Sequence, residues 1–110
     1  MNLNNGTSDI KCGGIIKYDY PRGQIIFNVE KYVDEENNTK YRYDYAECEN
    51  ILDRSKRIEA IIRSRYTQDE VEAIFANHLA GKSDDYTEFQ TWRSIAKQAA
   101  NGIYNKEDLT

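Results

Sequence analysis

Hydrophobic and polar positions alternate along residues 13–48, and the period changes to a helical one after Glu47. Between residues 24 and 33, Ile25, Phe27 and Val29 form one face of the pattern, and Ile26, Asn28 and Glu30 form the other. A period of two residues is typical of a β-strand. Turn-forming residues separate three such segments, which predicts a three-stranded antiparallel β-meander with strands at about residues 15–20, 24–33 and 40–46.

Apolar side chains recur every three or four residues in the second half of the chain, which predicts two to three α-helices. Thr67 and Glu70 have the spacing of a capping box and mark the start of the middle helix. We expect a single α+β domain, with a flexible lead-in at residues 1–12, the meander at 13–48, the helical part at 51–104 and a polar tail at 105–110. The helical stripes are Ile58, Ile61, Ile62 and Tyr66; Val71, Ile74, Phe75, His78 and Leu79; and Phe89, Trp92, Ala96, Ala99 and Ile103.

Two of these patterns are candidates for contact with a partner. The chain has nine tyrosines among its 110 residues, and tyrosine combines an apolar ring with a polar tip that suits half-buried faces and interfaces. The spacing of the last helix is that of a helix packed lengthwise on another, with small residues that permit close approach. The candidate interface residues are Tyr41, Tyr43 and Tyr45, on the inner or subunit-facing side of the sheet, and Phe89, Trp92, Ala96, Ala99 and Ile103.

The charge of the chain argues against a nucleic-acid-binding protein. The formal net charge is −4, whereas affinity for nucleic acid depends on neutralising phosphates with basic side chains. A basic run that includes Arg54, Arg57 and Arg65 keeps one alternative open, a small nucleic-acid-binding regulator that uses the helix at residues 54–65. The tyrosine face leaves a weaker alternative open, a module that contacts carbohydrate.

The residue types that catalysis needs are sparse. His78 is the single histidine and belongs to an apolar helical stripe, and Cys12 and Cys48 are too few for a four-ligand zinc site. Gly13 and Gly14 precede a strand rather than a helix, so they do not form a phosphate-binding loop. We therefore expect no enzyme, no metal and no cofactor. Two free thiols in a reducing compartment are favoured over a disulfide, although the pairing stays open.

The apolar runs are short. The polar N-terminus predicts no signal peptide, and runs such as residues 25–27 are far shorter than a membrane span requires. We expect a soluble, cytoplasmic protein that does not contact membranes.

Several segments of the chain resemble small proteins encoded by bacteriophages and prophages of gut anaerobes. These segments are residues 30–34, 64–74, 77–79 and 86–97. The resemblance runs from Glu30 onwards and rests on a capped helix followed by a helix rich in aromatic residues and alanine. It implies a structural component of the phage particle or an assembly accessory, with copies of itself or other phage proteins as partners. It also implies residence in the host cytoplasm, with incorporation into the virion left open. It carries over no catalytic residue.

Overall fold

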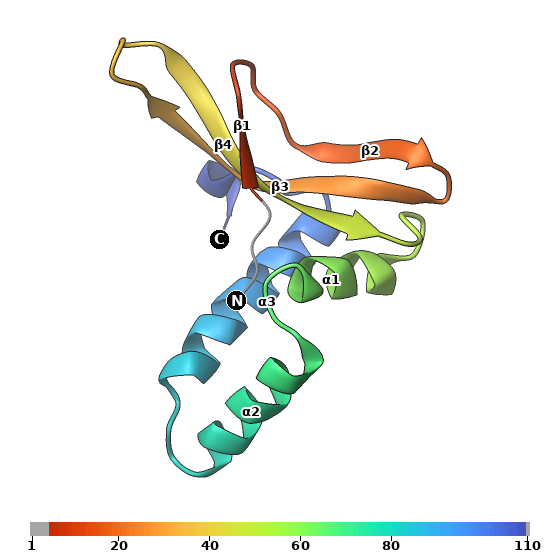
Figure 1. The fold of residues 1–110 in the computed structure, drawn as a ribbon, viewed down its shortest axis with the longest axis vertical. Helices are drawn as coiled ribbons and strands as arrows, with labels where there is room; N and C mark the ends of the chain where they lie inside the picture. The colour runs from red at the N-terminus through yellow and green to blue at the C-terminus, as the bar shows by residue number, and fades with distance from the viewer. Residues whose placement is uncertain (1–4, 110) are drawn as a thin grey trace.

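A computed structural model describes residues 5–109 and confirms the α+β class. A four-stranded sheet is followed by three α-helices and a short 3₁₀ turn (Figure 1). The elements are β1 (Asn5–Ser8), β2 (Gly14–Asp19), β3 (Arg22–Val33), β4 (Thr39–Cys48), α1 (Arg54–Arg63), α2 (Gln68–Leu79), α3 (Asp84–Ala100) and η1 (Lys106–Asp108).

The predicted meander is formed by β2, β3 and β4, and the sheet has one strand more than predicted. Its order is β1-β4-β3-β2, with every neighbouring pair antiparallel. The additional strand β1 comes from the segment expected as a flexible lead-in, of which residues 1–4 lie outside the described residues. Its short polar sequence has no alternation to reveal it, and Gly6 fits because a Cβ there would lie 2.7 Å from the Tyr43 hydroxyl oxygen.

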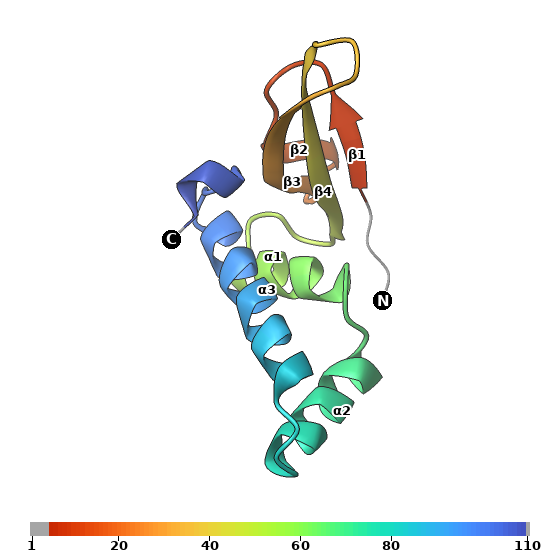
Figure 2. The same cartoon turned by 90° about the vertical axis from the view of Figure 1, so that its left-hand side faces the viewer.

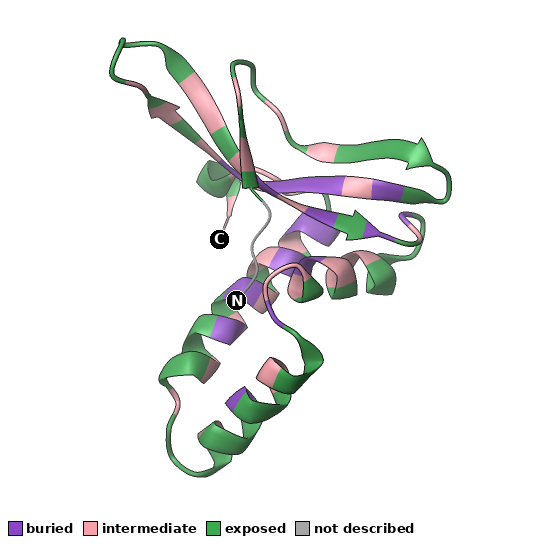
Figure 3. Cartoon of the chain, viewed as in Figure 1, coloured by how far each residue is buried: buried purple, intermediate pink, exposed green. Residues whose placement is uncertain are grey.

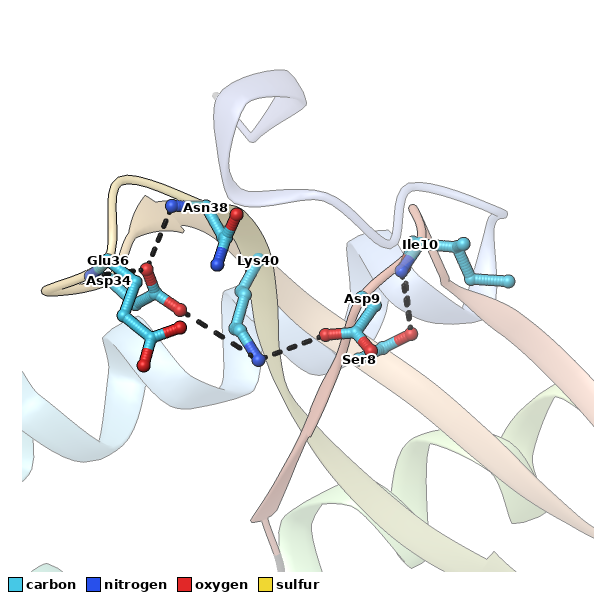
Figure 4. A network of polar contacts seen from close by, with 7 residues as sticks. All are labelled: Ser8, Asp9, Ile10, Asp34, Glu36, Asn38 and Lys40. Atoms are coloured by element: carbon cyan, nitrogen blue, oxygen red, sulfur yellow. Dashed lines mark hydrogen bonds and ion pairs between the residues drawn. The ribbon is translucent and has the colours of Figure 1, made fainter.

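The chain between β1 and β2 crosses from one edge of the sheet to the other, and a polar network fixes the start of this crossing (Figure 4). Lys40 Nζ lies 3.1 Å from Asp9 Oδ1 and 3.9 Å from Asp34 Oδ2. Asp34 Oδ1 accepts hydrogen bonds from the backbone N–H groups of Glu36 and Asn38, which closes the β3–β4 hairpin. Lys40 thus links the end of β1 to that hairpin.

The core lies between one face of the sheet and helices α1 and α3 (Figure 2). Phe27 on β3 meets Trp92 on α3 edge-to-face, with ring centroids 5.5 Å apart. The indole N–H of Trp92 donates to the backbone carbonyl of Ile61 on α1, so one side chain joins both helices to the sheet. Phe27 and Ile61 are fully buried at this junction.

The middle helix begins where the capping box predicts. The Thr67 hydroxyl accepts from the Glu70 backbone N–H at 3.1 Å, and the Glu70 carboxylate accepts from the Thr67 backbone N–H at 3.2 Å. Helix α2 then packs mainly on α3, and the two form a hairpin that projects away from the sheet (Figures 1 and 2). Gly81, with φ at +89°, lies in the turn between them.

Candidate interaction surface

The tyrosines of β4 lie on the face of the sheet that points away from the helices, so their placement on the inner side is wrong. Asp44, Ala46 and Cys48 are buried on the helix-facing side, whereas Tyr41, Tyr43 and Tyr45 are half-buried on the opposite face. The reason is steric, because the small side chains of Ala46 and Cys48 leave room for the aromatic residues of the helices. A partner-facing role for the three tyrosines stays a prediction.

The stripe on α3 lies inside the chain's own core. Trp92 and Phe89 are 2% and 3% exposed, Ala96 and Ala99 are equally buried, and Ile103 after the helix is half-buried. This differs from a stripe that awaits a partner, because the close helix contact that the small residues permit is made with α1 of the same chain. The four side chains on the helix itself therefore offer almost no free surface to a second molecule.

The largest group of exposed apolar side chains in the sheet lies along β2 instead. Ile16 is 51% exposed and Tyr18 is 54% exposed, and Tyr20 just beyond the strand is 62% exposed. The strand is last in the sheet order and pairs only with β3 among the described residues, so its other edge is open (Figure 3). Open edges present unpaired backbone N–H and C=O groups to other chains. The sequence does not mark β2 as an edge strand, because its pattern of apolar and polar residues resembles that of a strand with neighbours on both sides.

A hydrogen-bond network holds Tyr18 flat against the outer face of the sheet. Its hydroxyl donates to a carboxylate oxygen of Glu47 on β4, and the Gln24 amide donates to the other oxygen at 2.7 Å. The hydrogen bond to Glu47 is the main reason that the pKa of Tyr18 is raised above 10.0. The ring of Tyr18 is thus fixed across β3 while half of its surface stays in solvent, as in the pre-formed aromatic contacts of binding surfaces.

A second polar constellation surrounds a bulge in β3. Asn28 has φ at +54°, and its amide nitrogen donates to the buried Asp44 carboxylate at 2.7 Å. Glu30 pairs with Lys106 at 3.1 Å and with Arg42 at 3.7 Å, beside a cleft of about 300 Å³. Desolvation raises the pKa of Asp44, and the hydrogen bond from Lys106 lowers the pKa of Glu30. The Glu30 carboxylate lies near both cations, and its ion pair with Lys106 attaches the 3₁₀ turn to β3.

No local pattern in the sequence reveals this cluster, because its members are far apart along the chain. The sequence predicts a polar tail at residues 105–110, yet the described part of that segment lies against β3. The backbone N–H of Val29 donates to the Tyr104 carbonyl at 2.9 Å. Asn28 fits the alternation of the strand, and its one local sign of a bulge is that asparagine tolerates a positive φ better than most residue types.

His78 is held by stacking and one hydrogen bond. Its ring stacks on Tyr86 with centroids 3.7 Å apart, and its Nδ1 lies 2.8 Å from the Ser83 hydroxyl oxygen. Both contacts join the end of α2 to the start of α3. Within residues 5–109, no three His, Cys, Asp or Glu side chains come together in a way that could hold a metal ion.

Basic side chains of the segment at residues 54–65 are engaged inside the chain. Arg57 donates to the backbone carbonyls of Ile51 and Ala100, and Arg54 donates to the Asn101 side chain at 2.9 Å. Arg65 pairs with Glu88. The acceptors of Arg54 and Arg57 are neutral, so these two side chains keep their positive charge, whereas Glu88 and Glu59 compensate Arg65 and Lys56. The nucleic-acid alternative stays a hypothesis.

Both thiols are free in the structure, with Cys48 buried and Cys12 partly so. Burial raises the pKa of each thiol, which lowers the reactive thiolate fraction at neutral pH. The two cysteines therefore give no sign of an activated nucleophile.

None of the helices in the described part of the chain combines the length and the apolar character that crossing a membrane would need. Comparison of the sequence with family models and curated proteins, and of the fold with solved structures, gives no match. The resemblance to phage-encoded proteins thus stays a hypothesis, and the function has to be argued from the surface itself.

Proposed function

We propose that the chain is a non-enzymatic structural or assembly protein of the phage type, which acts through protein–protein contacts as an oligomer. The observation that carries the proposal is the open edge of β2, where Ile16, Tyr18 and Tyr20 expose half or more of their surfaces. Side chains of this kind are enriched at the centres of interfaces. Addition of a strand to an open edge is a recurring mode of protein recognition.

The other edge of the sheet supports this choice by contrast. Strand β1 has four residues, Asn-Gly-Thr-Ser, and carries no large apolar side chain. Short polar edges are a common protection against unwanted strand pairing. Strand β2 lacks this protection over Ile15 and Ile16, which suits an edge that is covered when the protein is assembled.

The proposal is tested on the full-length protein isolated from the cells that produce it, by sedimentation under native conditions. We expect a defined assembly larger than the 12.8 kDa of one chain. Ile16→Lys should abolish it, because a charge replaces the apolar centre of the edge. Leu52→Lys is the matched control, since Leu52 is 63% exposed but lies between β4 and α1. A parent protein that sediments as one chain at every concentration, with no other protein bound, would overturn the proposal.

A further inference from the structure

The backbone of β2 determines which of its groups are available to a further strand. The carbonyl oxygen of Ile16 points at β3, since a Cβ built on Gly23 would lie 2.6 Å from that oxygen. In an antiparallel pair, the backbone groups of successive residues point alternately toward the partner strand and away from it. The N–H and C=O groups of Ile15 and Lys17 therefore point to the open edge. A register shift between Lys17 and Asp19 ends the regular segment, which begins at Gly14.

We propose that the open edge of β2 pairs with β2 of a second copy of the chain, antiparallel and about a two-fold axis at Ile16. This inference rests on the proposed function, because it names the partner at the same edge. With the axis at Ile16, Ile15 of each copy lies opposite Lys17 of the other copy. The symmetry therefore gives two identical hydrogen-bonded pairs. The two copies thereby use all four outward-pointing backbone N–H groups of Ile15 and Lys17 with all four matching carbonyls.

Charge and side-chain size favour this register over its neighbours. An axis at Lys17 would place two like charges directly opposite, which destabilises strand pairs. An axis at Ile15 would require hydrogen bonds from the backbone of Gly13, which lies before the start of the strand. With the axis at Ile16, the two Ile16 side chains meet at the close, non-hydrogen-bonded position. The aliphatic stem of each Lys17 then covers an Ile15 that is 36% exposed.

A second copy is favoured over a different peptide by the residues themselves. Lys17 has no ion-pair partner among residues 5–109, and in the paired edge its ammonium group remains in solvent beside an apolar neighbour rather than another lysine. Two copies of β2 can therefore pair with apolar side chains at the centre and with no two like charges opposite each other.

Intermolecular disulfide formation tests the register directly. Opposed Cα atoms at a non-hydrogen-bonded pair are about 4.5 Å apart, within the range that a disulfide bridges. In a Cys12→Ser background, Ile16→Cys should give a linked dimer under mild oxidation. The matched control Lys17→Cys should not, because the two positions 17 are out of register across the axis. Sedimentation of the unmodified chain should show a dimer, and Ile16→Lys should weaken it at least about tenfold through lost apolar burial and opposed charges.

The outcomes separate this inference from the proposed function. Linking through Lys17→Cys but not Ile16→Cys would overturn the register. A dimer that neither cysteine links would overturn pairing through β2 and leave the proposed function standing. A complex with another protein that Ile16→Lys abolishes, while the chain alone stays monomeric, would overturn the second copy as the partner and also leave the proposed function standing. A chain that forms no assembly of any kind would overturn both.

Discussion

Helix α3 and strand β2 both carry large apolar side chains, and the fold treats them in opposite ways. Trp92 on α3 is 2% exposed, whereas Ile16 on β2 is 51% exposed. The helix runs under the sheet and along α1, so its stripe meets apolar surfaces on two sides. The strand has a neighbour on one side only. Placement in the topology, rather than the apolar pattern, decides whether a stripe is buried within the chain or left for contact with another molecule.

This contrast reverses the assignment that the sequence favours. Heptad spacing and small residues single out α3 as a surface for association, yet they are used for packing inside one chain. The edge strand has no comparable pattern and keeps its apolar surface in solvent. The segment with the clearer apolar periodicity can be the one that is buried in the chain's own core. The surface left for association then belongs to the segment with the weaker periodicity.

The largest expected effect comes from removing the Trp92 side chain of α3 from the core. Trp92→Ala removes a buried indole that packs on Phe27 and donates to the Ile61 carbonyl. It should lower the free energy of unfolding by about 3–5 kcal/mol, measured by chemical denaturation at low protein concentration. Trp92→Phe is the control and should cost less, because an aromatic ring still packs on Phe27 and Ser64 still donates to the Ile61 carbonyl. If Trp92→Ala unfolds like the parent protein, the core described for α3 is not its stabilising core.

Much of the fold could be predicted because its cues are local. The period of two in β3 and β4, the capping box at Thr67 and the glycine after α2 each act within a few residues, and the structure shows the predicted elements. Strand β1 escaped prediction because its four polar residues form a strand only through pairing with β4. Its backbone partners are provided by a segment more than thirty positions away, which no local pattern encodes.

The candidate surface was harder to predict for a related reason. Which face of β4 is covered depends on where the helices return, and the alternation of Tyr41, Tyr43 and Tyr45 is equally clear on either face. The polar cluster at Asn28 joins residues from β3, β4 and the C-terminal turn, so its formation needs the complete topology. Contacts between distant segments were therefore the part that the sequence left open.

Thr67→Ala addresses a contact that is local and lies away from both compared regions. The Thr67 hydroxyl accepts a hydrogen bond from Glu70 at the start of α2, and its loss should cost about 1 kcal/mol of stability. Thr67→Asp should be nearly neutral, since a carboxylate accepts the same bond. Thermal unfolding of the three proteins checks this, and an unchanged melting temperature for Thr67→Ala would show that α2 does not depend on its cap.

Asp44 provides a prediction about pH, because it is the buried carboxylate on the covered face of the sheet. Desolvation raises its folded-state pKa above 3.8, against opposing effects of Asn28, Lys106 and Arg65. The folded state then binds the proton more tightly than the unfolded state does. This contribution to stability is present below the ordinary pKa and is lost as the pH rises through the folded pKa.

Asp44→Asn should therefore remove a decline of stability with rising pH. The quantity to measure is the difference in unfolding free energy between the variant and the parent protein across the acidic range. The difference cancels the opposite slope that Glu30 and Glu70 contribute through their lowered pKa values. We expect the variant to gain stability relative to the parent as the pH rises. A constant difference would show that Asp44 titrates in the folded protein as it does in the unfolded chain.

The smallest change in stability is expected for a substitution on β2, and it is compared with the same substitution in the core. Ile16→Val and Ile61→Val remove the same methyl group, from a residue that is 51% exposed and from one that is 0% exposed. Both variants keep a β-branched side chain at the changed position. Ile61→Val should cost about 0.5–1.5 kcal/mol, whereas Ile16→Val should change monomer stability by less than about 0.5 kcal/mol. Denaturation at a concentration where the chain is monomeric measures both. An equal loss for the two variants would mean that Ile16 is already buried in the single chain, and the edge of β2 would then have no apolar surface left to offer a second copy.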